Sequence, residues 1–254
     1  MRTQPFKLKT WRGITQTIIA LLLMYGLWEA IAAVFPWPSP RAVIGTLAGQ
    51  LATAPFQAAL GHSLRRMVMG YLVVVVIGIG GGMLLGRIPV VDRILGSFAV
   101  AIHAIPGAAW VPLSIMWFGM TEQAVIFTVV LGAAGVVMVS TDTGIREVPP
   151  LIARAARTMG ARGLRYFWFV VVPAAIPKIV DGLRLAWAFG WRALMAGELF
   201  TSVSGLGGLL NQAGKTQDRT ALLALMTLIA VIGIAIDALF KLLQRRVWVR
   251  WGFV

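Results

Sequence analysis

The sequence predicts an all-α membrane protein with about six transmembrane helices. Of its 254 residues, 59% are apolar and only 13% are charged, whereas soluble domains are about 45–50% apolar and about 25% charged. Such a chain lacks the polar side chains needed to cover a water-facing surface. The absence of cysteine excludes a disulfide scaffold, and the high apolar content excludes a disordered chain.

Six apolar stretches are long enough to cross a bilayer, since a transmembrane helix needs about 20 residues. We expect them at about 14–34, 67–86, 94–118, 123–140, 179–200 and 221–243. The first is longer than the apolar core of a signal peptide, so we expect it to remain in the mature protein. Pro106 and Pro112 interrupt the third stretch, which predicts a broken or kinked helix there.

The basic residues indicate the orientation of these spans. The chain has 23 Lys and Arg against 9 Asp and Glu, giving a net charge of +14. In a soluble protein this excess would suggest nucleic acid, but in a membrane protein it marks cytoplasmic loops, so no nucleic acid partner is expected. With the N-terminus inside, sixteen of the 23 fall in inner segments, which predicts that both termini are cytoplasmic. Arg65 and Arg66 fall on the disfavoured outer side.

We divide the chain into three parts. Residues 1–57 hold an N-terminal cytoplasmic tail, the first span and an external segment, residues 58–245 hold the transmembrane core, and residues 246–254 form a cytoplasmic tail. An inner loop at about 141–178 is too long for a simple connection and too apolar for disorder. We expect short helices there, either as an interfacial hairpin that grips anionic lipid or as a docking surface for a cytoplasmic partner.

The order of residues in this loop favours the docking surface. Arg154-Ala155-Ala156-Arg157-Thr158-Met159-Gly160 is followed after nine residues by Val170-Val171-Val172-Pro173. This segment resembles the EAA loop of ABC importer permeases, which reads Glu-Ala-Ala, three residues, Gly, nine residues, Ile-x-Leu-Pro. Both alanines, the glycine, the proline and all spacings match, whereas Arg154 stands in place of the usual glutamate. Segments from His62, Ile105 and Ser204 look like the nitrate, sulfonate and taurine branch, so the resemblance covers nearly the whole chain.

The resemblance implies a type I ABC importer permease fold in the bacterial inner membrane. It implies that two copies form the pore, that two cytoplasmic ATP-binding subunits receive the loop, and that an extracytoplasmic binding protein delivers a small anion such as a sulfonate, taurine or nitrate. ATP and Mg²⁺ would be held by the ATPase, so this chain itself would bind no cofactor. The implied ATPase-coupling residues are Arg154, Ala155, Ala156, Arg157, Gly160 and Pro173.

The physical properties of these residues suit a docking helix. Two alanines in a short helix leave a small, flat face that another protein can approach closely, and Gly160 permits the helix to end immediately afterwards. Arg154 and Arg157 make the surface basic, which leads to the hypothesis of an acidic rim on the ATPase cleft.

No catalytic centre is expected in this chain. Gly214-Lys215-Thr216 imitates the end of a phosphate-binding loop, but Leu209 occupies the position of the required first glycine and no strand precedes it. His62 and His103 are the only histidines, there is no cysteine, and no acidic pair has metal-ligand spacing. Zinc, thiol and triad chemistry therefore lack their residues.

Charged residues inside spans are costly in hydrocarbon and usually face a partner or a water-filled path. Asp181, Arg184, Arg192 and Glu198 share one face of the fifth span, at about 100° per residue. Asp181 and Arg184 have the spacing of an ion pair. We assign Arg192 and Glu198 to a translocation path or gate, together with Trp110 between the two prolines of the third span.

Glycines recur every four residues on the second span. Gly78, Gly82 and Gly86 form the small-xxx-small pattern that lets helix backbones approach closely. We interpret them as a packing surface in preference to a moving joint.

The alternative function is a gradient-driven secondary carrier that uses Glu29, Glu198 or Asp237 as proton or cation sites. This alternative does not explain the basic loop, and the two halves of the chain show no clear internal repeat. Glu29, and Asp237 with Lys241, are otherwise expected to be interface or ion-pair residues. A third possibility is a non-transporting scaffold or lipid-surface anchor.

Overall fold

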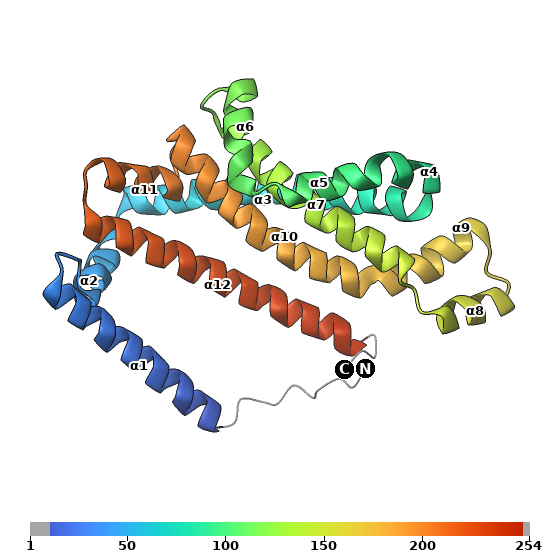
Figure 1. The fold of residues 1–254 in the computed structure, drawn as a ribbon, viewed down its shortest axis with the longest axis horizontal. Helices are drawn as coiled ribbons and strands as arrows, with labels where there is room; N and C mark the ends of the chain where they lie inside the picture. The colour runs from blue at the N-terminus through green and yellow to red at the C-terminus, as the bar shows by residue number, and fades with distance from the viewer. Residues whose placement is uncertain (1–10, 251–254) are drawn as a thin grey trace.

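The computed structural model describes residues 11–250, and every regular element in that range is helical (Figure 1). This confirms the predicted all-α class. The elements are α1 (Trp11–Val34), α2 (Pro40–Leu51), α3 (Ala54–Arg87), α4 (Pro89–Val91), the π-helix η1 (Asp92–Gly96), α5 (Ser97–Ala104), the 3₁₀-helix η2 (Gly107–Trp110), α6 (Val111–Phe118), α7 (Glu122–Arg146), α8 (Pro150–Thr158), α9 (Gly163–Tyr166), the π-helix η3 (Phe167–Val171), α10 (Val172–Thr201), α11 (Leu206–Lys215) and α12 (Arg219–Arg250).

The predicted spans fall on α1, α3, the α4–α6 segment, α7, α10 and α12. Among the described residues, α3, α7 and α12 have the length and apolar composition of a membrane span, and the bent α4–α6 segment is a fourth candidate. The apolar part of α1, Ile18–Val34, is a shorter helix. Helix α10 is 30 residues long and carries several charged side chains, which distinguishes it from the uniformly apolar spans.

The third span is a broken helix, which is one of the two forms predicted for it. Its two arms, Pro89–Ala104 and Gly107–Phe118, meet at an angle of 103°. The break lies at Ile105, whose φ of −79° and ψ of 125° are extended, because a residue before proline is pushed out of the helical region. Pro112 lies in the first turn of α6, where no backbone donor is required, and so it does not bend the helix.

Helix α7 is the centre of the molecule and packs against both α3 and α10. The glycines at positions 78, 82 and 86 of α3 lie at the contact with α7. A Cβ atom added to Gly78 would lie 2.5 Å from Cβ of Val137, and one added to Gly82 would lie 2.5 Å from the backbone oxygen of Met138. The backbones of α3 and α7 therefore approach more closely than larger side chains would allow.

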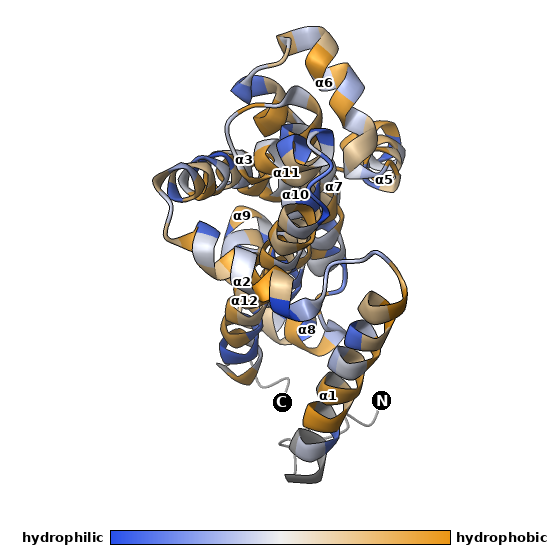
Figure 2. Cartoon of the chain, turned by 90° about the vertical axis from the view of Figure 1, so that its left-hand side faces the viewer, coloured by the Kyte–Doolittle hydropathy of each residue, from blue (hydrophilic) through white to orange (hydrophobic). Residues whose placement is uncertain are grey.

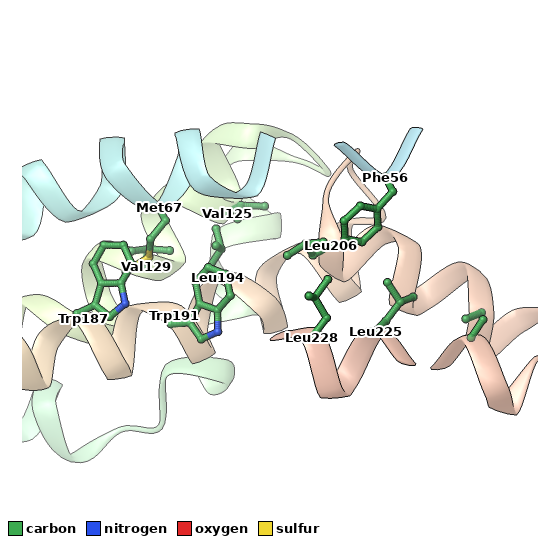
Figure 3. Packing of buried hydrophobic residues seen from close by; sticks show 12 residues of the cluster. Phe56, Met67, Val125, Val129, Trp187, Trp191, Leu194, Leu206, Leu225 and Leu228 are labelled. Atoms are coloured by element: carbon green, nitrogen blue, oxygen red, sulfur yellow. The ribbon is translucent and has the colours of Figure 1, made fainter. Parts of the chain in front are cut away.

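The largest hydrophobic cluster joins five helices (Figure 3). Met67 of α3, Val129 of α7 and Trp187 of α10 lie together in one part of it, and Phe56 of α3 and Leu206 of α11 lie against α12 in the other. Because these side chains come from distant parts of the chain, their burial holds α3, α7, α10, α11 and α12 in one bundle.

Helix α1 lies apart from this bundle and packs against α2 (Figure 1). Its side chains Ile18, Leu22 and Leu23 are more than half exposed, and Figure 2 shows hydrophobic residues along much of the helix. An apolar helix exposed on several sides is suited to contact with lipid or with another helix, since exposing this much apolar surface to water is unfavourable.

An ion pair and a hydrogen bond join charged groups of α10 to α12. Nε of Arg184 lies 2.7 Å from Oδ1 of Asp237, and Nζ of Lys241 lies 2.9 Å from Oδ2 of the same carboxylate. Asp181 instead accepts a hydrogen bond from the Gln244 amide at 2.8 Å. The predicted pair of Asp181 with Arg184 is therefore wrong, because Arg184 reaches both oxygens of Asp237 across the helix contact. The predicted ion pairing of Asp237 with Lys241 is confirmed.

The glycine contact predicts different effects for two neighbouring positions on α3. Gly82→Ala places a Cβ against the backbone of α7, and we expect it to destabilise the protein by about 1–3 kcal/mol through overpacking. The measurement is the thermal unfolding midpoint of the detergent-purified chain, with size-exclusion chromatography used to monitor the fraction that remains folded. Gly80→Ala is the matched control, because a Cβ there meets no atom within 4 Å. An equal loss in both variants would contradict the close contact.

Candidate functional site

The sites predicted from the sequence lie in three regions of the bundle. Figure 1 places α8 and α9 at one end of the long axis and α2 and α11 at the opposite end, and we call these the α8 end and the α11 end. The residues of the EAA-like loop lie at the α8 end. Glu198 lies beside α11, whereas Arg192 lies on a separate, exposed surface of α10.

The EAA-like loop folds into short helices. Helix α7 extends to Arg146 and α10 begins at Val172, so the connection is shorter than the predicted 141–178. Ala156 of α8 is buried, with 4% of its surface exposed, whereas Ala155 is exposed. The two alanines therefore do not share one flat exposed face, because consecutive residues lie about 100° apart around a helix.

Gly160 ends α8 in a Schellman motif. The N–H of Gly160 donates to the carbonyl of Arg157 at 3.1 Å, and the N–H of Ala161 donates to the carbonyl of Ala156 at 3.0 Å. This pattern requires a left-handed residue after the helix, and Gly160 has a φ of +83°. A side chain at this position would be strained, which explains the need for glycine.

A groove of about 380 Å³ separates α8 from the start of α10. Its lining is almost entirely apolar and consists of Pro149, Ile152, Ala155, Ala156, Met159, Phe169, Val170, Pro173 and Ala174. The fold thus brings Pro173 close to both alanines of the loop. Leu151 of α8 is 74% exposed, and Met159, the residue that follows the helix, is 80% exposed, so this region offers apolar side chains to a partner.

The arginines of α8 leave its surface positively charged. Nε of Arg154 donates to the carbonyl of Pro150 in the same helix at 3.3 Å, and the Arg157 guanidinium lies 5.8 Å from the centre of the Tyr166 ring. Within residues 11–250, neither side chain forms an ion pair with a carboxylate. Their charge is therefore available to an acidic partner.

Contacts to the neighbouring helices connect the loop to the bundle. The guanidinium of Arg87, at the end of α3, lies 4.5 Å from the centre of the Phe167 ring in η3. Arg146, at the end of α7, bonds to Asp92 of η1 at 2.8 Å and to the carbonyl of Leu85 at 3.1 Å. These contacts were not predicted, because their partners are far apart in the sequence. The first contact attaches η3 to α3, and the contacts of Arg146 join the end of α7 to α3 and η1.

A buried charge network joins four helices near the α11 end. Arg66 of α3 is 1% exposed and Glu198 of α10 is fully buried. Nη1 of Arg66 donates to Glu198 at 2.7 Å, and Nη2 donates to Glu122 of α7 at 2.8 Å. Glu122 also pairs with Arg65. Carboxylates thus neutralise both arginines that opposed the predicted orientation, which the sequence count could not show.

The same network caps helix α11. The hydroxyl of Ser63 donates to the Glu198 carboxylate at 2.7 Å and accepts the N–H of Leu206 at 2.8 Å. The N–H of Gly207 donates to Glu198 at 3.0 Å. A negative carboxylate suits the start of a helix, where N–H groups lack intrahelical partners. A Cβ at Gly205 would collide with the same carboxylate, so the glycine in the Ser-Gly-Leu-Gly-Gly segment leaves the space that Glu198 occupies.

The proposed path residues occupy different environments. Arg192 is exposed on α10, and its guanidinium lies 5.7 Å from the centre of the Phe189 ring, which in turn contacts His103 of α5. In the described part of the chain, Arg192 has no carboxylate partner. Trp110 of η2 is half-buried, and its indole N–H has no hydrogen-bond partner among the described residues. Glu198, by contrast, is enclosed.

Comparison with known proteins identifies the class to which this fold and this loop belong. The family described as "Binding-protein-dependent transport system inner membrane component" matches residues 74–249. The taurine transport system permease protein TauC of Escherichia coli K12 is 31% identical, covering 92% of this chain and 89% of the relative. The nitrate import permease protein NrtB of Leptolyngbya laminosa is 25% identical over 94% and 89% of the two chains. An inward-facing structure of the MetNI methionine ABC transporter has a TM-score of 0.66 at 21% identity, covering 76% of this chain and 96% of that chain.

The chain belongs to the family of inner-membrane components of binding-protein-dependent transport systems. It is a permease subunit of an ABC importer in the bacterial inner membrane, with the type I importer fold. In these systems the ATPase is a separate subunit, and the permease is neither an enzyme nor a cofactor-binding chain. The predicted resemblance is thereby confirmed.

The buried network predicts a strong and non-additive effect on stability. Glu198→Gln and Arg66→Gln each leave a buried charge without its main partner, and we expect each to cost about 3–5 kcal/mol. The double variant should lose much less stability than the two single variants lose together, because it removes both charges. Thermal unfolding of the purified chain measures all three, and strictly additive losses would argue against the pair.

The exposed pair of Glu29 with Arg41 is the control for this cycle, because the Arg41 side chain is 83% exposed. Glu29→Gln and Arg41→Gln should change stability by less than about 1 kcal/mol.

Proposed function

We propose that two copies of this chain form a path for a small organic or inorganic anion of the sulfonate, taurine or nitrate type. The named substrates of TauC and NrtB support this class. We further propose that the α8 end faces the cytoplasm and two ATP-binding subunits, and that the α11 end faces an extracytoplasmic solute-binding protein. Both termini are then cytoplasmic.

The α8 region is the observation that carries the coupling assignment. Its helix combines exposed apolar side chains at positions 151 and 159 with arginines that have no acidic partner in residues 11–250. Such a surface is suited to a cleft with an apolar floor and an acidic rim. Arg154 replaces the family's usual glutamate, so we expect the rim to be acidic at this point in its own ATPase.

Contacts at the α8 end of the bundle support a mechanical role for the loop in transport. Closure of the ATPase dimer on ATP draws the two loops together, and the Arg87–Phe167 and Arg146–Asp92 contacts carry this displacement into α3, α7 and η1. ATP binding shifts the conformational equilibrium only because the ATPase has different affinities for the two arrangements of the loop. The cavity then opens outward, and it reopens inward after hydrolysis and product release.

The coupling assignment predicts a loss of ATPase binding when the charge of α8 is reversed. In the variant Arg154→Glu with Arg157→Glu, co-purification with the ATPase and ATP-dependent uptake should both fall by about tenfold or more, since each charged contact is worth about 1.5–3 kcal/mol. Replacing residues 151–162 by a flexible linker should abolish both. Arg93→Glu, an exposed reversal on η1, is the matched control. Retained binding and uptake in the linker variant would defeat the assignment.

Arg192 supports an anion path. A charged side chain in a span is costly unless it meets a partner or water, and Arg192 is exposed on α10 beside Phe189 and His103 without a described carboxylate partner. In a dimer, two such guanidinium groups can hold an anion between apolar surfaces. We propose Trp110 and Glu198 as gate elements instead. Glu198 would act by holding the start of α11 in place, and Trp110 would act through its position in the broken third span.

The path assignment predicts that charge at position 192 controls uptake. Arg192→Gln should lower the initial rate of anion uptake in proteoliposomes by about tenfold or more, because a charge-assisted hydrogen bond is lost. Arg192→Lys should retain part of the rate. ATPase co-purification should be unchanged in both variants, which separates a path role from misfolding. Equal uptake by the Gln variant and the wild type would exclude Arg192 from the path.

The secondary-carrier alternative is not favoured. Its three candidate carboxylates are all ion-paired within the chain, Glu29 with Arg41, Glu198 with Arg66, and Asp237 with Arg184. Family membership also favours the permease. Uptake driven by an ion gradient in the absence of ATP would revive the carrier.

A further inference from the structure

A pocket of about 250 Å³ opens at the α11 end between α2, α3, α11 and α12. It is lined by Gln50, Thr53, Pro55, Phe56, Leu209, Gln212, Ala213, Thr216, Asp218, Ala221 and Leu225. None of these residues belongs to α5, α6 or α10, so the pocket is separate from the surface that carries Arg192. The transport path does not account for it.

The lining divides into an apolar base and a polar rim. Phe56, Ala213, Ala221 and Leu225 are buried, whereas Thr53, Gln212, Thr216 and Asp218 are exposed. The pocket therefore offers apolar surface and polar groups side by side. Lysine and arginine side chains suit such a lining, because their methylene groups lie along apolar side chains while the cationic head donates to polar groups.

Two side chains of the pocket have unused capacity to accept hydrogen bonds. The side-chain oxygen of Gln50 is buried and has no hydrogen-bond partner among the described residues, which is a costly state for a polar atom. Asp218 has no ion-pair partner in the described chain, and its Oδ1 accepts the N–H of Ala221 at 2.9 Å. The neighbouring Arg219 does not neutralise it, because that guanidinium donates to the carbonyl of Pro36 at 3.0 Å.

We propose that this pocket is a socket for a lysine or arginine side chain of the extracytoplasmic solute-binding protein. The methylene groups of that side chain would lie on Phe56 and Leu225, and its cationic head would donate to Gln50 and Asp218. The inference rests on the proposed function, which places the α11 end outside the cell. An acidic socket on a chain of net charge +14 gives a docking partner one defined position, since charge complementarity selects orientation.

The walls of the socket are held in place before any partner arrives. The start of α11 is capped by Ser63 and Glu198, and the start of α2 is capped by Ser39, whose hydroxyl accepts the N–H of Ala42. A preorganised pocket avoids part of the ordering cost of binding. The buried network thus serves the socket as well as the bundle.

The test uses the assembled transporter in nanodiscs, with its ATPase subunits, titrated with the substrate-loaded solute-binding protein of the same system. Asp218→Asn removes the charge but keeps the cap of α12, because asparagine caps helices as well as aspartate does. We expect its Kd for the binding protein to rise about tenfold, as expected for a lost charged hydrogen bond. The Kd of this variant should depend less on salt concentration than the Kd of the wild type does.

Two further variants make the result specific. Glu29→Gln removes another carboxylate at the same end, one that is already paired with Arg41, and should leave the Kd unchanged. Adding Gln50→Glu to Asp218→Asn returns a carboxylate to the pocket and should restore the wild-type Kd and salt dependence. A wild-type Kd in Asp218→Asn, or an equal loss in Glu29→Gln, would overturn the socket.

Failure of the socket and failure of the proposed function give different results. If the wild-type complex binds the solute-binding protein and imports substrate while Asp218→Asn behaves identically, only the socket is wrong. If the wild-type chain assembles with neither the ATPase nor the binding protein, the proposed function is wrong.

Discussion

The enclosed carboxylate of Glu198 is the constraint on which the α11 end depends. An ionised group without water requires several compensating donors, and here they come from Arg66, Ser63 and the backbone of Gly207. These donors lie on α3 and α11, so satisfying one charge fixes how three helices meet. The chain accommodates the carboxylate by using glycine at positions 205 and 207, where a Cβ would collide with Glu198.

The arginines at the two ends of the molecule are satisfied in different ways. Near the α11 end, the buried Arg66 pairs with Glu122 and Glu198 inside the bundle. At the α8 end, the arginines of α8 form no ion pair with a carboxylate within residues 11–250. Arg87 instead attaches η3 to the end of α3 through the Phe167 ring.

The close packing of α3, α7 and α10 connects these ends. Gly78, Gly82 and Gly86 bring α3 against α7, and the Tyr71 hydroxyl donates to the carbonyl of Leu183 in α10 at 2.7 Å. In a bilayer, close van der Waals packing and interhelical hydrogen bonds take over much of the role that the hydrophobic effect has in water. Side chains that point away from this centre are correspondingly apolar and exposed, as on α1 and α12.

Local features of the sequence were sufficient to predict the all-α class, the approximate positions of the long helices, the family resemblance and the glycine that ends α8. Each depends on composition, periodicity or spacing over a few turns of helix. The tertiary structure decided what the charges do. Arg66 pairs with a glutamate 132 residues away, and Arg184 bonds to α12 in place of its near neighbour Asp181. Ala155 and Ala156 face different sides of α8, and the two arms of the third span meet at 103°. Contacts between distant segments follow from how helices pack, and sequence spacing carries no information about which charge will be enclosed beside which partner.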